Sequence, residues 1–364
     1  MARIDLDLAH AYRRNPEKDE DYALLPLKMS FRDGGAYALL GPSGCGKTTL
    51  LNIVSGLVKP SQGNVQFDGE IVTGKTPQQR NIAQVFQFPV IYDTMTVSEN
   101  LAFPLRNRRV DAEKIKQRVG QIAEMLELSG QLNQRAAGLS ADAKQKISLG
   151  RGLVRDDVSA VLFDEPLTVI DPHLKWQLRR KLKQIHNELK LTLIYVTHDQ
   201  VEALTFAEEV VVMTRGRAVQ IGSADQLFER PQHTFVGHFI GSPGMNFLPA
   251  TADAGSIKVA GQTLVVGERS TALFASGDCT LGIRPEYVAI TEPQAEGAIA
   301  VKVMQVQDVG TYWLVSATAA ETIIRARLSP EWAPPKIGET AWFSVFGKHT
   351  CFYKNDVLIE GASV

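Results

Sequence analysis

The stretch that most constrains this chain is GPSGCGKT, residues 41–48, which lies between an apolar run and an amphipathic segment. It fits the pattern G-x-x-x-x-G-K-[ST] in full. Glycines let the backbone N–H groups of such a loop close around phosphate oxygens, and the helix that follows presents the positive end of its dipole to them. The segment therefore predicts a strand, a phosphate-binding loop and a helix in succession, which is a unit of an α/β fold.

The loop also supplies side chains suited to a nucleoside triphosphate. Lys47 is expected to reach the β- and γ-phosphates, and the hydroxyl of Thr48 can join the ligand shell of a Mg²⁺ ion. Cys45 fills a position that the pattern leaves free. The predicted nucleotide contacts in this stretch are Gly41, Pro42, Ser43, Gly44, Cys45, Gly46, Lys47, Thr48 and Thr49.

Two later apolar runs end abruptly in polar residues, as buried parallel strands do when their carboxyl ends carry chemistry. VLFDEP ends in Asp164, expected to hold Mg²⁺ through water, and Glu165, expected to accept a proton from the attacking water. LTLIYVT is followed by His198. A single histidine after a strand is usually a capping or core residue, but beside a phosphate-binding loop it is expected to reach the γ-phosphate.

Gln87, in VFQFP, also ends a short apolar run. Its side-chain oxygen can contact Mg²⁺ or the attacking water. A surface amide is an equally good interpretation of a lone glutamine, so the residues alone leave both open.

The pattern of the chain divides it into two domains. Up to residue 240, short β-type runs alternate with longer helical patterns, which predicts a mostly parallel sheet covered by helices, with an inserted helical subdomain at about 90–155. Residues 241–364 change to short alternating runs separated by Gly, Pro and Asp, which predicts an all-β barrel or sandwich.

Composition excludes several classes of protein. A net charge of −1 and a pI near 6.7 give no support for nucleic-acid binding. The three cysteines have no disulfide or metal-ligand spacing, which favours a reducing compartment. The first residues lack the apolar region of a signal peptide. No apolar run approaches the ~18 residues of a membrane span, so a membrane role is expected to be peripheral, through a partner.

Taken together, these motifs resemble the ATP-binding cassette (ABC) ATPases. In that family a phosphate loop, a glutamine loop, an L-S-G-G-Q signature, an Asp-Glu pair, a D-loop and a switch histidine follow in this order. The matching positions here are Gly41–Thr48, Gln87, Leu139-Ser140, Asp164-Glu165, Asp171 at the end of LTVID, and His198. Tyr12 fits the aromatic that stacks on adenine. The resemblance implies ATP and Mg²⁺ as ligands, and it implies that the metal is held by Thr48, Gln87 and Asp164.

The second half of the chain limits the resemblance to one type of ABC ATPase. FIGSPGMNFL and LGIRPEYVAI are similar to the accessory β-barrel (OB-like, TOBE-type) domain of maltose-importer-type ATPases. That implies a peripheral subunit on the cytoplasmic face of the membrane, in an assembly of two ATPases on two permeases, fed by an extracytoplasmic binding protein. Residues 88–105 are then expected to help form the groove for the permeases, although core packing explains their apolar content equally well.

The signature is where the sequence departs from the family. Ser140 is in place, but Ala141 and Asp142 replace the two glycines and Ala143 replaces the glutamine. Glycines matter because backbone N–H groups must approach a phosphate without a Cβ in the way. Asp142 also brings a negative charge, and at ~4 Å with an effective dielectric of about 20 one charge pair repels by at most ~4 kcal/mol.

This departure predicts an asymmetric partnership. The chain's own ATP site is intact, but its signature is expected to serve a partner's ATP poorly. A heterodimer with a second, non-identical ATPase keeps one good composite site, and importers of glycerol or other polyols resemble that arrangement. The alternative is an ATP-binding regulatory or structural ABC subunit with little turnover of its own. A soluble ABC protein of translation or DNA maintenance fits less well, because those usually carry two cassettes or a long coiled coil.

Overall fold

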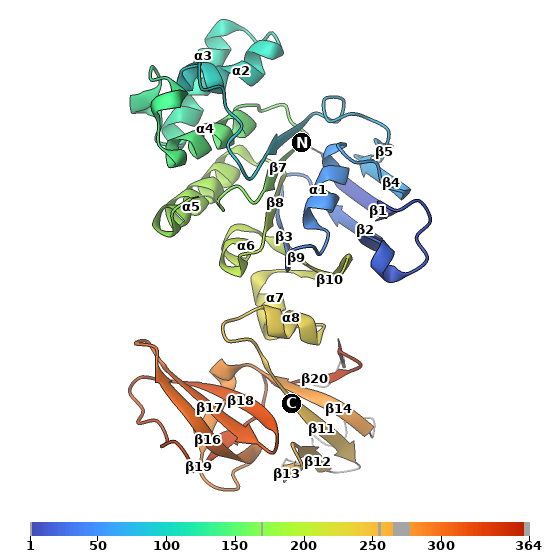
Figure 1. Cartoon of the computed structure of the whole chain (residues 1–364), viewed down its shortest axis with the longest axis vertical. Coiled ribbons are helices and arrows are strands. Elements are labelled where there is room, and N and C mark those ends of the chain that lie inside the picture. The colour runs from blue at the N-terminus through green and yellow to red at the C-terminus, as the bar shows by residue number, and fades with distance from the viewer. Residues whose placement is uncertain (1, 169, 254–255, 265–276, 360–364) are drawn as a thin grey trace. The chain divides into compact units, whose positions relative to one another are not determined.

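The computed structural model describes residues 2–168, 170–253, 256–264 and 277–359 (Figure 1). The chain forms two compact units, Met1–Ala224 and Asp225–Val364. Val169, within the LTVID segment, lies outside the described residues, as do parts of the predicted β domain at 254–255, 265–276 and 360–364.

A six-stranded sheet forms the centre of the first unit. Five of its strands run parallel, and the edge strand β10 is antiparallel to β9 through a turn at Arg215 and Gly216, both at positive φ. In spatial order the strands are β10 (Arg217–Gly222), β9 (Glu209–Thr214), β3 (Ala36–Leu40), β8 (Leu193–Thr197), β7 (Ala160–Asp164) and β6 (Ile82–Val85).

This sheet is buried on both faces, which explains its near-continuous apolar runs. Along β7, Val161 and Phe163 belong to one core cluster and Leu162 to the other. The first cluster contains side chains of α2 (Val97–Asn107), α3 (Ala112–Met125), α4 (Ala141–Leu153) and α5 (Pro172–Leu189).

The second cluster joins the central sheet to α1 and to a smaller antiparallel sheet. The smaller sheet has the order β2 (Leu24–Phe31), β1 (Ile4–His10), β4 (Gln62–Phe67) and β5 (Glu70–Ile71). α1 (Lys47–Ser55) follows β3, and α6 (Gln200–Phe206) follows β8. The segment expected to be a helical insertion, 90–155, contains α2, α3 and α4.

The second unit consists mainly of two antiparallel sheets around one core. One has the order β13 (Gln262–Leu264), β12 (Ser256–Val259), β11 (Asn246–Asp253), β14 (Gly277–Ile283), β20 (Cys351–Lys354) and β21 (Val357–Leu358). The other is β15 (Ala289–Thr291), β19 (Thr340–Ser344), β16 (Ala298–Asp308), β17 (Trp313–Ala319) and β18 (Thr322–Leu328). The predicted fold class, a P-loop α/β domain followed by a β-rich domain, is confirmed.

The second unit begins earlier in the chain than the boundary near 240 expected from the sequence. α7 (Ala224–Glu229) and α8 (Thr234–Phe239) precede its first strand. The buried guanidinium of Arg284 donates to the backbone carbonyls of Leu227, Phe228 and Ile240, and Thr234 donates its N–H to the carbonyl of Asp356. These bonds attach the short helices to the β-rich unit.

Candidate nucleotide site

Residues that are distant in the sequence meet at the carboxyl edge of the central sheet. β3, β8, β7 and β6 are parallel neighbours, and their register aligns Leu40 with Thr197, Val196 with Asp164, and Phe163 with Val85. The residues just beyond these positions are therefore neighbours at one edge, and they are Gly41, His198, Glu165 and Gln87. This is the edge at which open α/β sheets bind ligands.

Two glycines of the phosphate loop are required by close backbone packing. A Cβ at Gly41 would lie 2.2 Å from the carbonyl oxygen of Met213. Gly46 has φ +104°, and a Cβ there would lie 2.6 Å from the carbonyl oxygen of Ala23. Gly46 also precedes the first residue of α1, so no side chain covers the N–H groups that open this helix.

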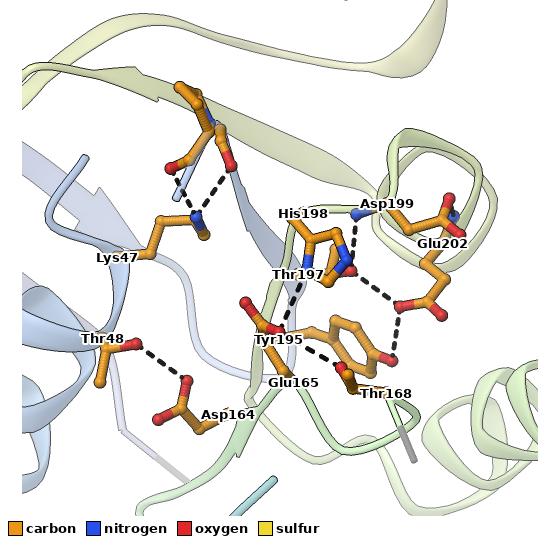
Figure 2. Close-up of polar contacts among 12 residues, drawn as sticks. Lys47, Thr48, Asp164, Glu165, Thr168, Tyr195, Thr197, His198, Asp199 and Glu202 are labelled. Carbon is orange, nitrogen blue, oxygen red and sulfur yellow. Dashed lines mark hydrogen bonds and ion pairs between the residues drawn. The ribbon is translucent and has the colours of Figure 1, made fainter. Parts of the chain in front are cut away.

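Lys47 is held over the same loop. Its Nζ donates to the carbonyl oxygens of Gly41 at 2.8 Å and Pro42 at 3.0 Å, and the residue is almost fully buried (Figure 2). Burial raises the pKa of the nearby Cys45 thiol more than Lys47 lowers it, so that cysteine stays neutral. The loop thus places one cation beside the uncapped start of α1, an arrangement suited to phosphate.

Thr48 and Asp164 form the oxygen pair expected for a metal. The hydroxyl of Thr48 donates to a carboxylate oxygen of Asp164 at 3.1 Å (Figure 2). Burial raises the pKa of Asp164, and the hydrogen bond from Thr48 lowers it in part. Within the described residues no cluster of three or more His, Cys, Asp or Glu could hold a metal unaided. Both observations fit Mg²⁺, which takes one or two protein oxygens together with substrate phosphates.

Glu165 and His198 contact each other directly. Nδ1 of His198 lies 3.1 Å from Oε2 of Glu165, and the hydroxyl of Thr168 donates to the same oxygen at 3.2 Å (Figure 2). Glu165 has φ +47°, a conformation rare for a side-chain-bearing residue, and its N–H bonds to the carbonyl of Val196 at 3.0 Å. Such strain clusters at functional sites. The carboxylate is held close to the histidine at the edge where the phosphate loop opens.

Tyr12 lies next to the same loop although it follows β1 of the smaller sheet. Its hydroxyl is 3.2 Å from Oγ1 of Thr49, and its ring meets His10 edge-on at 4.6 Å between centroids. The tyrosine is 68% exposed, which leaves ring surface available for an adenine base. Gln87 is half-buried and lies two residues beyond the end of β6.

The altered signature lies at the start of α4. Ser140 caps the helix by accepting the N–H of Ala143 at 3.3 Å. Asp142 turns along its own helix to Lys146, with 3.4 Å between Oδ2 and Nζ, and its side chain is 23% exposed. The repulsion of up to ~4 kcal/mol expected for a bare carboxylate is therefore reduced by a countercharge. The Cβ atoms of Ala141 and Asp142 remain.

Asp171, the predicted D-loop residue, caps α5. Its Oδ1 accepts the N–H of His173 at 2.9 Å. Its carbonyl accepts the N–H of Lys175 at 2.9 Å.

Comparison with known proteins identifies the family. The sequence matches the ABC transporter family over residues 24–168, the MalK OB fold domain over 241–288 and the TOBE domain over 281–351. It is 39% identical over 319 residues to the sn-glycerol-3-phosphate import ATP-binding protein UgpC of Shigella sonnei (strain Ss046), covering 87% of this chain and 89% of that protein. The UgpC protein of Escherichia coli (strain K12) matches with the same identity and coverage.

The chain belongs to the ATP-binding subunits of ABC importers. The ABC ATPase also resembles the solved structure of cbiO1 from Clostridium perfringens, part of the ABC transporter complex cbiONQ. That match has a TM-score of 0.57 and 24% identity and covers 63% of this chain and 90% of the other, so it supports the fold. The predicted ATPase activity with ATP and Mg²⁺, and the peripheral position on the cytoplasmic face of the membrane, are confirmed by the family.

In the described part of the chain, no helix has both the length and the apolar character that a membrane span requires.

Sequence reasoning missed three contributors to these sites. Thr168 bonds Glu165 from three residues away, and Lys146 pairs with Asp142 at the i,i+4 spacing, a signal the sequence did contain. Glu202, buried behind His198, sits in a short helix with no local sign of its partners.

Proposed function

We propose that this ABC ATPase powers uptake of a carbohydrate or polyol and pairs with a second, non-identical ATPase subunit. The two UgpC relatives are named for import of sn-glycerol-3-phosphate. Glycerol is the first solute to test and its phosphate ester the second. Transport has to be tested directly, because the permeases and the binding protein select the solute.

The observation that carries the proposal is the start of α4. Ser140 uses its own hydroxyl to bond the N–H of Ala143, and the two positions between them carry Cβ atoms where the family has glycines. A partner's γ-phosphate that approached these N–H groups would meet the Cβ atoms first. The charge repulsion is smaller than the sequence suggests, because the ammonium of Lys146 lies 3.4 Å from the carboxylate of Asp142, although it also lies 3.9 Å from that of Glu127. The proposed defect is therefore mainly steric.

The chain's own ATP site supports hydrolysis once a partner supplies a sound signature. In this proposal Lys47 binds the β- and γ-phosphates, and Thr48 and Asp164 hold Mg²⁺, which neutralises phosphate charge. Glu165 accepts the proton of the attacking water as general base, and His198, 3.1 Å away, orients that carboxylate and contacts the γ-phosphate. Gln87 faces the same edge and Tyr12 stacks on adenine.

The proposed membrane partners are two permease subunits, with an extracytoplasmic binding protein acting through them. A cavity of about 470 Å³ lies beside the segment 88–105, and Phe103, Pro104, Arg108 and Arg151 are among the residues that line it. The guanidinium of Arg151 is stacked 4.7 Å from the ring centroid of Tyr92. The cavity combines apolar and cationic groups, which suits a helix that carries both apolar and acidic side chains.

ATPase measurements on the chain alone and with its partner subunit test the proposal. We expect feeble turnover alone and brisk turnover of the pair. The double change Ala141→Gly with Asp142→Gly is expected to raise turnover of the chain alone about tenfold or more, since it restores the approach to phosphate. Asp142→Asn removes only the charge and is expected to change little. Full turnover by the unmodified chain alone would contradict the pairing.

A further inference from the structure

A buried carboxylate lies directly behind the turn that carries His198. Glu202, on α6, is 4% exposed, and a carboxylate removed from water in this way must be bonded to remain charged. Its Oε2 accepts hydrogen bonds from the hydroxyls of Thr197 at 2.8 Å and Tyr195 at 3.1 Å (Figure 2). Both donors come from β8, the strand that ends just before His198.

The hydrogen bond between Thr197 and Glu202 is part of a chain of hydrogen bonds through the turn. The hydroxyl of Thr197 has a single hydrogen, which it donates to Glu202, and its oxygen then accepts the N–H of Asp199 at 3.0 Å. Asp199 caps α6 by accepting the N–H groups of Val201 and Glu202. The residues on either side of His198 are therefore tied to one carboxylate and to the start of one helix.

The other oxygen of Glu202 faces α5. Nζ of Lys175 lies 3.9 Å from Oε1. Lys175 belongs to the first turn of the helix that Asp171 caps, and its N–H bonds the carbonyl of Asp171 at 2.9 Å. Glu202 thus contacts both the turn that presents His198 and the helix that follows the D-loop residue.

We propose that Glu202 is a positioning residue for ATP hydrolysis, which fixes His198 against Glu165 through Thr197 and links that turn to α5 through Lys175. In this proposal Glu202 acts through its protein partners Thr197 and Lys175. It acts on the reaction because the distance from Nδ1 of His198 to Oε2 of Glu165 depends on the backbone that carries the histidine. The inference rests on the proposed role of His198.

Two buried hydroxyls on the same strand provide a matched comparison. Thr197→Val keeps the shape of the side chain but breaks the path from Glu202 to the histidine turn. Tyr195→Phe removes the second hydrogen bond to the same oxygen and leaves that path intact. A purely structural role for Glu202 predicts similar effects from both changes, whereas a positioning role predicts an effect from Thr197→Val alone.

The first measurement is steady-state ATP turnover of the assembled transporter. Thr197→Val is expected to lower kcat about tenfold while KM for ATP changes less than about twofold, because binding is retained and only the catalytic geometry loosens. Tyr195→Phe is expected to stay within about twofold of the unmodified kcat, and Thr197→Ser, which keeps the hydroxyl, is expected to restore it. Equal losses of kcat in Thr197→Val and Tyr195→Phe, or no loss in either, would overturn the proposal.

The second measurement needs no turnover and so separates this proposal from the role of His198 itself. The ring ¹⁵N resonances of His198 in the full chain, assigned with His198→Gln, are expected to shift in Thr197→Val and stay unchanged in Tyr195→Phe. Unshifted resonances in Thr197→Val would overturn the positioning. Unchanged kcat in His198→Ala would instead refute the role proposed for the histidine. If Thr197→Val does not fold, Thr197→Ala, which removes the same hydroxyl with a smaller side chain, is expected to give the same shift and the same loss.

Discussion

The starts of α1 and α4 are the two helix N-termini at which the family places a phosphate, and here they are built in opposite ways. α1 is preceded by Gly46, which has a left-handed conformation and no side chain. α4 is preceded by Ser140, whose hydroxyl already accepts the N–H of Ala143, and its first two residues carry Cβ atoms. The helix dipole favours an anion at the N-terminus of α1 and at that of α4. What separates them is access of the phosphate to free backbone N–H groups.

The charges near the starts of α1 and α4 differ as well. Near α1 the ammonium of Lys47 is fixed by loop carbonyls. Near α4 the cation Lys146 is engaged by the carboxylate of Asp142. At the start of α1 a phosphate would gain a charge-assisted hydrogen bond from Lys47. At the start of α4 the nearby cation is already paired with Asp142. This contrast supports the proposal that the chain binds its own ATP well and covers a partner's ATP poorly.

The strongest test of the chain's own, intact ATP site is the change Glu165→Gln. It removes the proposed general base and keeps the shape, so kcat for ATP is expected to fall about 10²–10⁴-fold while ATP still binds. Turnover and nucleotide affinity of the assembled transporter measure this, and the same change at the exposed Glu208 serves as the control. Transport that survives Glu165→Gln would favour a regulatory subunit in place of a working ATPase.

Adding a Cβ to the intact helix start should also weaken phosphate binding, here by disturbing the backbone of the loop itself. Gly46→Ala places a methyl 2.6 Å from the carbonyl oxygen of Ala23 at φ +104°, so ATP affinity is expected to fall more than about tenfold, with a loss of ~1–3 kcal/mol in unfolding free energy. Equilibrium nucleotide binding and thermal unfolding measure the two effects. Gly74→Ala, where no described atom lies within 4 Å of the added Cβ, is the control. Equal affinities in both variants would refute the steric account.

A smaller effect is expected at the adenine side of the site. Tyr12→Ala removes an aromatic face worth ~0.5–1.5 kcal/mol, so the Kd for ATP is expected to rise about two- to tenfold. Tyr12→Phe keeps the ring and loses only the contact with Thr49, and it is expected to bind ATP as the unmodified chain does. The reverse order of affinities would show that the hydroxyl, and not the ring, holds the base.

The smallest effect concerns the residue beside that tyrosine. His10 is buried, both of its ring nitrogens lack a partner among the described atoms, and burial lowers its pKa. The unfolded chain therefore binds a proton more readily, so stability is expected to fall as the pH drops below about 6.5 toward the lowered folded pKa. Thermal unfolding followed from pH 8 to pH 5 should show a shift on the order of 2 °C that His10→Phe abolishes. An identical pH profile in both proteins would contradict this origin.

Local patterns predicted the strands and the phosphate loop well, because a continuous apolar run and the G-x-x-x-x-G-K-[ST] pattern are both visible within a single segment. They did not predict Thr168 at Glu165 or the bonds of Arg284, because the partner of Thr168 depends on the unusual φ of Glu165 and those of Arg284 are backbone carbonyls. Carbonyls occur at every residue and leave no pattern in a sequence. The boundary near 240 stays a prediction: the OB fold match begins at 241, whereas α8 and most of α7 lie in the compact unit that begins at Asp225.

The sequence by itself determined which chemical groups stand at the strand ends, namely a glycine-rich loop with Lys47, an Asp-Glu pair and a histidine, and it also showed a signature without its glycines between the loop and the pair. Only the tertiary structure decided which of these groups meet. Parallel pairing brings His198 within 3.1 Å of Glu165 across 33 positions of chain, while Asp142 turns to Lys146 on its own helix. The physical reason is that residue type fixes a group's chemistry, whereas its partner is set by the register of long-range strand pairing and by the side-chain conformation that packing allows.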